Sequence, residues 1–210
     1  MEMNEYMQAV RKNWLVVLAA VLIGLLAGWG FAAASPKKYT SYSQIMFAMA
    51  GAESVSDINS ASTYTMAQMP TYQGLAVSPV VMNPVAKGIG LGGWTDIDGS
   101  VSASAVPESV LLNVTAEADS PERARDVAQG VARELVKQVE GANAATSKAK
   151  MTPKITAPAN LPAVPSAPKT PVFALAGGIL GGLLGILAAV IREALRVVAS
   201  RKAAVGREDR

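Results

Sequence analysis

Two long stretches of this chain contain no charged residue, and each is long enough to form a helix that crosses a lipid bilayer. Residues 14–34 and residues 172–191 consist almost wholly of apolar side chains and glycine. At about 1.5 Å per residue, such stretches form helices of about 30 Å, the thickness of the hydrocarbon layer. Trp14 and Trp29 lie near the ends of the first stretch, as is typical of side chains at a membrane interface. The sequence therefore predicts two transmembrane helices rather than a soluble globule.

A secretory signal peptide is the alternative for the first stretch, because Ala32, Ala33 and Ala34 offer small-residue cleavage sites. Its 21 residues exceed the apolar core of about 7–15 residues that signal peptides carry. Two acidic residues, Glu2 and Glu5, also precede it, where a signal peptide is basic. A retained membrane anchor fits these features better.

Charged residues are distributed unevenly around the two stretches. Residues 1–13 and 192–210 together hold 8 Lys and Arg, whereas the much longer segment 35–171 holds 11, balanced by 11 Asp and Glu. Because Lys and Arg close to a span stay on the cytoplasmic side, we expect both termini in the cytoplasm and residues 35–171 outside. The net charge of +3 then resides in a basic tail, residues 192–210, and the neutral external segment speaks against nucleic acid as a partner.

Little in the chain points to catalysis. The sequence has no Cys and no His, which excludes disulfides and thiol chemistry and removes the commonest general base and metal ligand. Asp96 and Asp98 lie in a glycine-rich turn, where a solvated turn explains them better than acid–base chemistry or a weak cation site. Residues 88–93 match G-x-G-x-x-G, but no strand is expected before them and no helix after them. We expect no enzyme, cofactor or metal.

The external segment has the pattern of an α+β domain, which we expect over residues 35–140. Strands are predicted over residues 39–48, 101–106 and 110–116, the last two joined as a hairpin. A helix is expected over residues 59–75, kinked or ended at Pro70. A second is expected to begin at Pro79, with Ser78 as N-cap, and to be closed by Gly88 and Gly90; Pro84 either lies within it or marks a restart. A third should run from the N-cap Ser120 to Gly141, with an apolar stripe that packs on the domain's own sheet.

Prolines follow this domain. Residues 141–171 hold six of the 12 prolines, which favours an extended, polyproline-like strut that returns to the membrane; a passive spacer is the alternative. Four of them form the membrane-proximal part of this segment: Pro158, Pro162, Pro165 and Pro168.

Glycines recur at four-residue spacing in both apolar stretches. In lipid, small residues let helix backbones approach closely, so this spacing predicts a packed contact, either between the two spans or between subunits of an oligomer. The glycines concerned are Gly24, Gly28, Gly177, Gly178, Gly181, Gly182 and Gly185.

The order of short motifs along nearly the whole chain resembles the Wzz-type chain-length determinants, or polysaccharide co-polymerases, including the shorter Gram-positive modulators of capsule and exopolysaccharide synthesis. The first half of the resemblance rests on Arg11-Lys12-Asn13-Trp14, Tyr39, Ser78-Pro79-Val80-Val81, Val85 and Gly90-Leu91. The second half rests on Val114-Thr115-Ala116, residues 118–124, and Ala157, Pro158, Pro162, Pro165, Ser166 and Pro168 before the glycine-rich second span.

The resemblance implies a bacterial plasma-membrane protein that forms homo-oligomers and sets the length of polymers made by a membrane polymerase. It also implies that the growing glycan or the polymerase is a partner, and that a cytoplasmic tyrosine kinase is recruited through the C-terminal tail. Residues 192–210 contain no Tyr and no kinase domain, so such a kinase is a separate chain. The external segment is too short for the long helices of large family members.

The tail has two alternative roles: docking a protein partner, or binding anionic lipid. Its candidate residues are Arg192, Arg196, Arg201 and Lys202. The rival function is an accessory subunit that supports the pore of an envelope channel or transporter, with glycine-rich helices around the pore. A third, an enzyme acting on lipid-linked sugar, would depend on Asp96 and Asp98.

Overall fold

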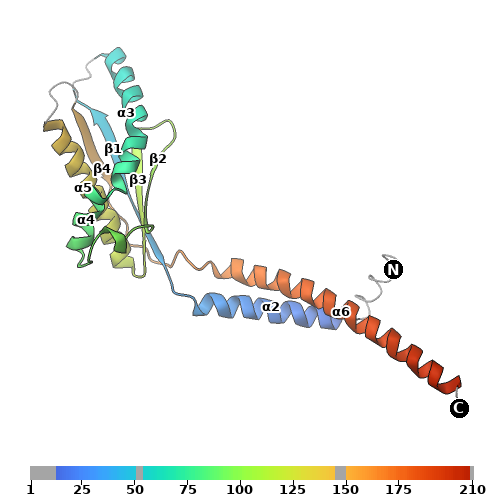
Figure 1. Cartoon of the computed structure of the whole chain (residues 1–210). Helices are drawn as coiled ribbons and strands as arrows, with labels where there is room; N and C mark the ends of the chain where they lie inside the picture. Colours follow the sequence, from blue (N-terminus) through green and yellow to red (C-terminus); the bar gives the residue numbers. More distant parts are fainter. Residues whose placement is uncertain (1–12, 51–53, 145–149, 209–210) are drawn as a thin grey trace. The chain divides into compact units, whose positions relative to one another are not determined.

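The computed structural model describes residues 13–50, 54–144 and 150–208, and the chain divides into two units. One unit, Met1–Pro36 with Ala167–Arg210, holds a pair of long helices; the other, Lys37–Ser166, is an α+β domain. Figure 1 shows both units and labels their elements.

The two long helices are α2, Trp14–Ala34, and α6, Thr170–Glu208. Helix α2 covers the same residues as the first expected span. Helix α6 begins two residues before the second expected span and continues without a break to residue 208, so most of the expected tail is helical (Figure 1). Both helices are long and apolar enough to cross a membrane, with mean hydropathies of 2.4 and 2.3 over their most apolar windows. Their large apolar side chains are mostly exposed, as in a helix that faces lipid.

The domain is built on a four-stranded antiparallel sheet with the strand order β2-β3-β1-β4. Its strands are β1, Tyr39–Met49; β2, Val101–Ala105; β3, Leu111–Ala118; and β4, Met151–Ala157. The three predicted strands are confirmed, including the hairpin of β2 and β3. Its turn holds Glu108 at a φ of 53°, the left-handed conformation that a tight turn requires.

Strand β4 corrects the prediction for the proline-rich segment. The sequence predicts an extended strut over these residues, but residues 151–157 pair with β1 from Met49↔Met151 to Gln44↔Ala157. Pro153 is tolerated because β4 is an edge strand, where a missing N–H breaks no central ladder. The sheet therefore extends beyond residue 140, the expected end of the domain.

The chain that follows β4 is irregular and runs along β1. The Ser41 hydroxyl donates to the carbonyl of Asn160 at 2.6 Å, and the Tyr42 N–H donates to Asn160 Oδ1 at 3.0 Å. Further along, the Ser166 N–H donates to the carbonyl of Lys38 at 2.8 Å. Residues 158–166, with Pro158, Pro162 and Pro165, thus form an irregular segment that is hydrogen-bonded to the domain.

Helix α3, Val55–Ala76, is longer than predicted at its N-terminus and is not ended by Pro70. It begins earlier because Ser54 and Asp57 form a capping box, in which each side chain accepts a hydrogen bond from the other's backbone N–H. Pro70 is exposed, so water can satisfy the carbonyl that a proline N leaves unpaired in a helix.

Helix α4, Pro79–Gly88, begins at the predicted residue and ends at the first of the two glycines expected to close it, with Pro84 accommodated inside it. Ser78 occupies the N-cap position, but its hydroxyl donates to the carbonyl of Leu75 instead of capping the helix. A short 3-10 helix, η1 (Trp94–Asp96), follows. Helix α5, Pro121–Ala144, is capped by Ser120 as predicted but passes through Gly141, since a glycine ends a helix only where the chain turns out of it.

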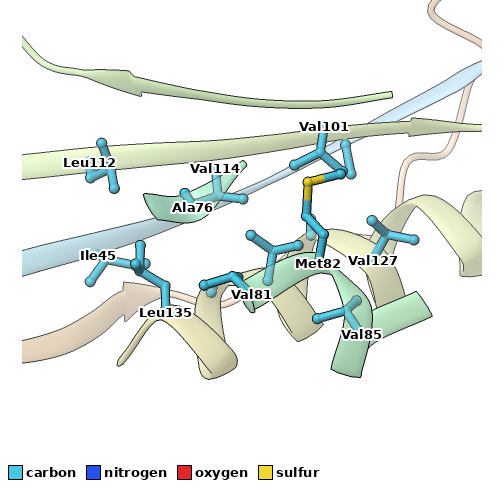
Figure 2. Packing of buried hydrophobic residues seen from close by; sticks show 14 of the residues in the cluster. Ile45, Ala76, Val81, Met82, Val85, Val101, Leu112, Val114, Val127 and Leu135 are labelled. Carbon is cyan, nitrogen blue, oxygen red and sulfur yellow. The ribbon is translucent and has the colours of Figure 1, made fainter. Parts of the chain in front are cut away.

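Helices α3, α4 and α5 contribute to one hydrophobic core on one face of the sheet, and Figure 2 shows its side chains converging from strands and helices. The predicted stripe of α5 is confirmed as the face that packs on the sheet: its members from Ala124 to Leu135 are buried. On α3, the Tyr72 ring stacks on Phe47 of β1 with centroids 4.4 Å apart. Burial, with a smaller contribution from Tyr64, raises the pKa of the Tyr72 hydroxyl.

Ser54→Ala is expected to destabilise the domain by about 1 kcal/mol, because it removes the side-chain acceptor for the first turn of α3. Urea unfolding of the full chain in detergent, followed by Trp94 fluorescence, would measure the change. Ser56→Ala is the matched control, since Ser56 is exposed on the same helix and caps nothing. Equal midpoints for the two variants would contradict a stabilising role for the capping box.

Candidate functional site

The glycines of α2 and α6 bring the two helix backbones into direct contact. The helices run antiparallel: Gly24 lies beside Gly177, Gly28 beside Phe173, and Ala20 beside Gly181. A methyl group on Gly24 would overlap the carbonyl oxygen of Gly177 and lie 3.0 Å from the Cα of Gly181. No side chain larger than a hydrogen atom fits there, which accounts for glycine at these positions.

The remaining glycines of the set also face α2. A methyl group on Gly185 would lie 3.0 Å from the Cα of Val17, and one on Gly178 would lie 2.8 Å from a side-chain carbon of Leu25. At Gly182 the same test gives an ordinary contact of 3.4 Å with Val21. In the described chain these glycines form the contact between its own two long helices. Where the C-terminal end of α2 meets the N-terminal end of α6, the ring centroids of Phe31 and Phe173 lie 5.8 Å apart.

A polar cavity of about 410 Å³ lies at one end of the domain's sheet. Its charged lining residues are Lys38, Asp96, Asp98, Glu117, Asp119 and Arg123. The Gly92 N–H donates to Asp96 Oδ2 at 2.9 Å and the Gly99 N–H donates to Asp98 Oδ1 at 3.1 Å, so both carboxylates bind the backbone of their own turn. In the described part of the chain, no group of three or more acidic, His or Cys side chains is placed to hold a metal ion.

The glycine-rich loop at residues 88–93 has the wrong surroundings for a dinucleotide site. It follows helix α4 and leads into η1, whereas the fingerprint requires a strand before it and a long helix after it.

The sheet face opposite the core is not covered by any helix among the described residues, because α3, α4 and α5 all pack on the other face. We call it the open sheet face. It comprises the side chains that alternate with the buried ones: Thr40, Tyr42, Gln44, Met46 and Ala48 of β1; Ser102 and Ser104 of β2; Leu111, Asn113, Thr115 and Glu117 of β3; and Thr152, Lys154 and Thr156 of β4.

Strand register arranges part of this face in two rows. Ser102, Thr115 and Tyr42 lie opposite one another on β2, β3 and β1, and Ser104, Asn113 and Gln44 form the next row. The Gln44 amide donates to Asn113 Oδ1 at 3.0 Å, which orients both amides. Tyr42 is 54% exposed although it lies on a central strand.

The tail residues are placed only in part. Arg192 is exposed on α6. Arg196, Arg201 and Lys202 belong to the same helix, but their side chains lie outside the described residues.

Sequence reasoning missed the open sheet face because it missed β4. The signal was present, since Met151, Pro153 and Ile155 alternate with Thr152, Lys154 and Thr156 as in a half-buried strand. Pro153 in the strand and Pro158 after it led to the prediction of a proline-rich strut instead of a strand.

The structure confirms the predicted class: an α+β domain with an antiparallel sheet, flanked in sequence by two long apolar helices that pack together. The family model for chain length determinant proteins, Wzz, matches residues 1–89, from the N-terminus through α4. Among solved structures, the chain is similar to a full-length bacterial polysaccharide co-polymerase, with a TM-score of 0.50 and 12% identity over 93% of this chain and 98% of that one. At this identity the likeness shows the fold. A search of curated proteins finds no match.

Proposed function

We propose that the protein is a non-enzymatic membrane regulator of surface-polysaccharide chain length, which acts as an oligomeric scaffold for the polymerase or the growing glycan. The observation that carries the proposal is the agreement of two independent comparisons. The chain-length determinant model matches the first 89 residues, and the fold of a full-length co-polymerase matches 93% of the chain.

In this proposal α2 and α6 cross the plasma membrane and the domain lies outside the cytoplasm. The antiparallel contact of α2 and α6 supports this topology, because a helical hairpin has both free ends on the same side. Arg11 and Lys12 precede α2, and Arg192 follows the apolar part of α6, so both free ends are basic as cytoplasmic ends are.

The glycine contact also bears on how copies would assemble. Since the glycines of α2 and α6 face each other within one chain, contacts between copies would use the outer faces of these helices or the domain. The same contact gives no support to the alternative of a pore-supporting subunit, because the glycines meet a neighbouring backbone and do not line a polar path.

Deletion of the gene tests the proposal. We expect the polysaccharide to change from a narrow distribution of lengths to a broad one, with little change in its total amount, because the polymerase itself remains. Gel electrophoresis of the extracted polymer measures both quantities, and a plasmid copy of the gene is the control. An unchanged length distribution would refute the chain-length role.

We assign the basic end of α6 to a cytoplasmic protein partner of the tyrosine-kinase class. Removal of residues 192–210 is then expected to lower autophosphorylation of a co-expressed candidate kinase several-fold. A second variant replaces Arg192, Arg196, Arg201 and Lys202 by neutral residues. It is compared with the truncation because it removes the charges but keeps the length of the helix. Equal autophosphorylation with the full and the truncated chain would leave lipid binding as the role of the tail.

A further inference from the structure

The open sheet face differs from an ordinary solvated sheet face in its charge. Soluble domains carry about 25% charged residues overall. On this face, within the described strands, only Glu117 and Lys154 are charged, and neither belongs to the two central rows. Hydroxyl and amide side chains take their place. The face therefore offers many hydrogen-bond donors and acceptors and almost no ionic partner.

The side-chain amides of Gln44 and Asn113 on this face are oriented by hydrogen bonds. The Gln44 side-chain amide donates a hydrogen bond to Asn113 Oδ1 at 3.0 Å. The Thr156 hydroxyl donates to the backbone carbonyl of Gln44 at 3.2 Å and lies 3.5 Å from Gln44 Oε1. The bond from Gln44 occupies the side-chain oxygen of Asn113, while the Asn113 amide nitrogen donates to no other described residue. An oriented amide with free donors can bind a hydroxyl group without first losing side-chain freedom.

Tyr42 adds an aromatic surface beside these polar groups. Tyr42 is more than half exposed on a central strand, with Thr115 opposite it on β3 and Ser102 beyond Thr115 on β2. Strands lie about 4.8 Å apart, so the row sets one ring and two hydroxyls at short, regular intervals. An apolar ring edged by neutral donors and acceptors matches a sugar ring, which has apolar faces and a rim of hydroxyls.

We propose that the open sheet face binds a neutral segment of a polysaccharide chain, with Tyr42 stacking on a sugar ring and Asn113 and Gln44 binding its hydroxyls. This inference rests on the proposed function, which supplies the glycan. Charge complementarity selects the occupant: an anionic polymer would find no cluster of Lys or Arg here. A protein partner would require the apolar, serine-poor centre that interfaces have.

The test uses the full chain in lipid nanodiscs and oligosaccharides cut from the source organism's own surface polysaccharide, with binding measured by calorimetry. Tyr42→Ala is expected to weaken binding at least about tenfold, as loss of a central aromatic contact does, and Asn113→Ala to weaken it several-fold. Tyr64→Ala is the control, because Tyr64 is 49% exposed on α3, on the covered side of the sheet. Affinity should stay constant from about 0.05 to about 0.5 M NaCl, since no ion pairs form.

Equal affinities of the wild type and Tyr42→Ala, absence of binding by the wild type, or a steep loss of affinity with salt would each overturn the inference. The gene deletion tests the chain-length role independently of glycan binding at the open sheet face. If deletion broadens the polymer lengths while Tyr42→Ala leaves binding unchanged, the chain-length role stands and only the open sheet face is excluded.

Discussion

The Gly24→Val variant is expected to lose the contact between α2 and α6, at a cost of about 3 kcal/mol or more. Overpacking usually costs about 1–3 kcal/mol where neighbouring side chains can move aside. At Gly24 the added atoms meet the carbonyl oxygen of Gly177 and the Cα of Gly181, which are backbone atoms. The helices can accept valine there only by separating along their whole line of contact.

Titration of the folded protein with SDS in mixed micelles would measure this loss, because Trp14 and Trp29 on α2 report on the surroundings of that helix. Gly30→Val is the matched control: it makes the same substitution on the same helix, where a methyl group would meet nothing within 4 Å. Similar midpoints for the two variants would show that the glycine contact does not hold the helices together.

Phe47→Ala is expected to destabilise the domain by about 3–5 kcal/mol, which is a large part of the stability of a domain of this size. Phe47 is completely buried, and its ring stacks on Tyr72, so truncation leaves a cavity between β1 and α3. Partial collapse of α3 onto the sheet would reduce the cost but not remove it.

Urea unfolding of the full chain in nanodiscs, followed by the fluorescence of Trp94, would measure the effect, because Trp94 packs against the core. Tyr42→Ala is the control on the same strand: it removes an aromatic ring from the open sheet face and should cost about 1 kcal/mol or less. A smaller loss for Phe47→Ala than for Tyr42→Ala would contradict the assignment of the core to the other face.

The fold could be predicted wherever residue pattern and local stop signals agree. Helix α2 covers the apolar stretch 14–34, because that stretch contains no proline and no charged residue that would interrupt a helix. The hairpin of β2 and β3 follows from two apolar alternations joined by a short turn. Helix α5 follows from Ser120 and a continuous apolar stripe, which decide its start and its buried face.

Single residues that can end an element are weak boundary signals. Gly141, which was expected to end its helix, and Pro70, which was expected to kink or end its helix, both lie inside helices. Each lies on an exposed part of its helix, where tertiary contacts elsewhere hold the helical backbone. Pro153 argued against a strand, because proline is tolerated only in edge strands and the sequence does not reveal that β4 lies at the edge of the sheet. These outcomes depend on tertiary position, which local propensity does not encode.

The candidate sites were predictable to different degrees. Glycine spacing predicted close helix packing, but only the structure shows that Gly24 meets Gly177 of the same chain. The rows on the open sheet face could not be predicted, because they depend on the register that places Tyr42, Thr115 and Ser102 opposite one another.

The length of the polysaccharide in strains that differ only in this gene tests the central claim most directly. We expect a narrow length distribution with the wild-type gene and with Gly30→Val, and a broad one with Gly24→Val and with the deletion. Membrane levels of the protein must be equal in the three strains that carry the gene. A narrow distribution in the deletion strain would contradict the chain-length role.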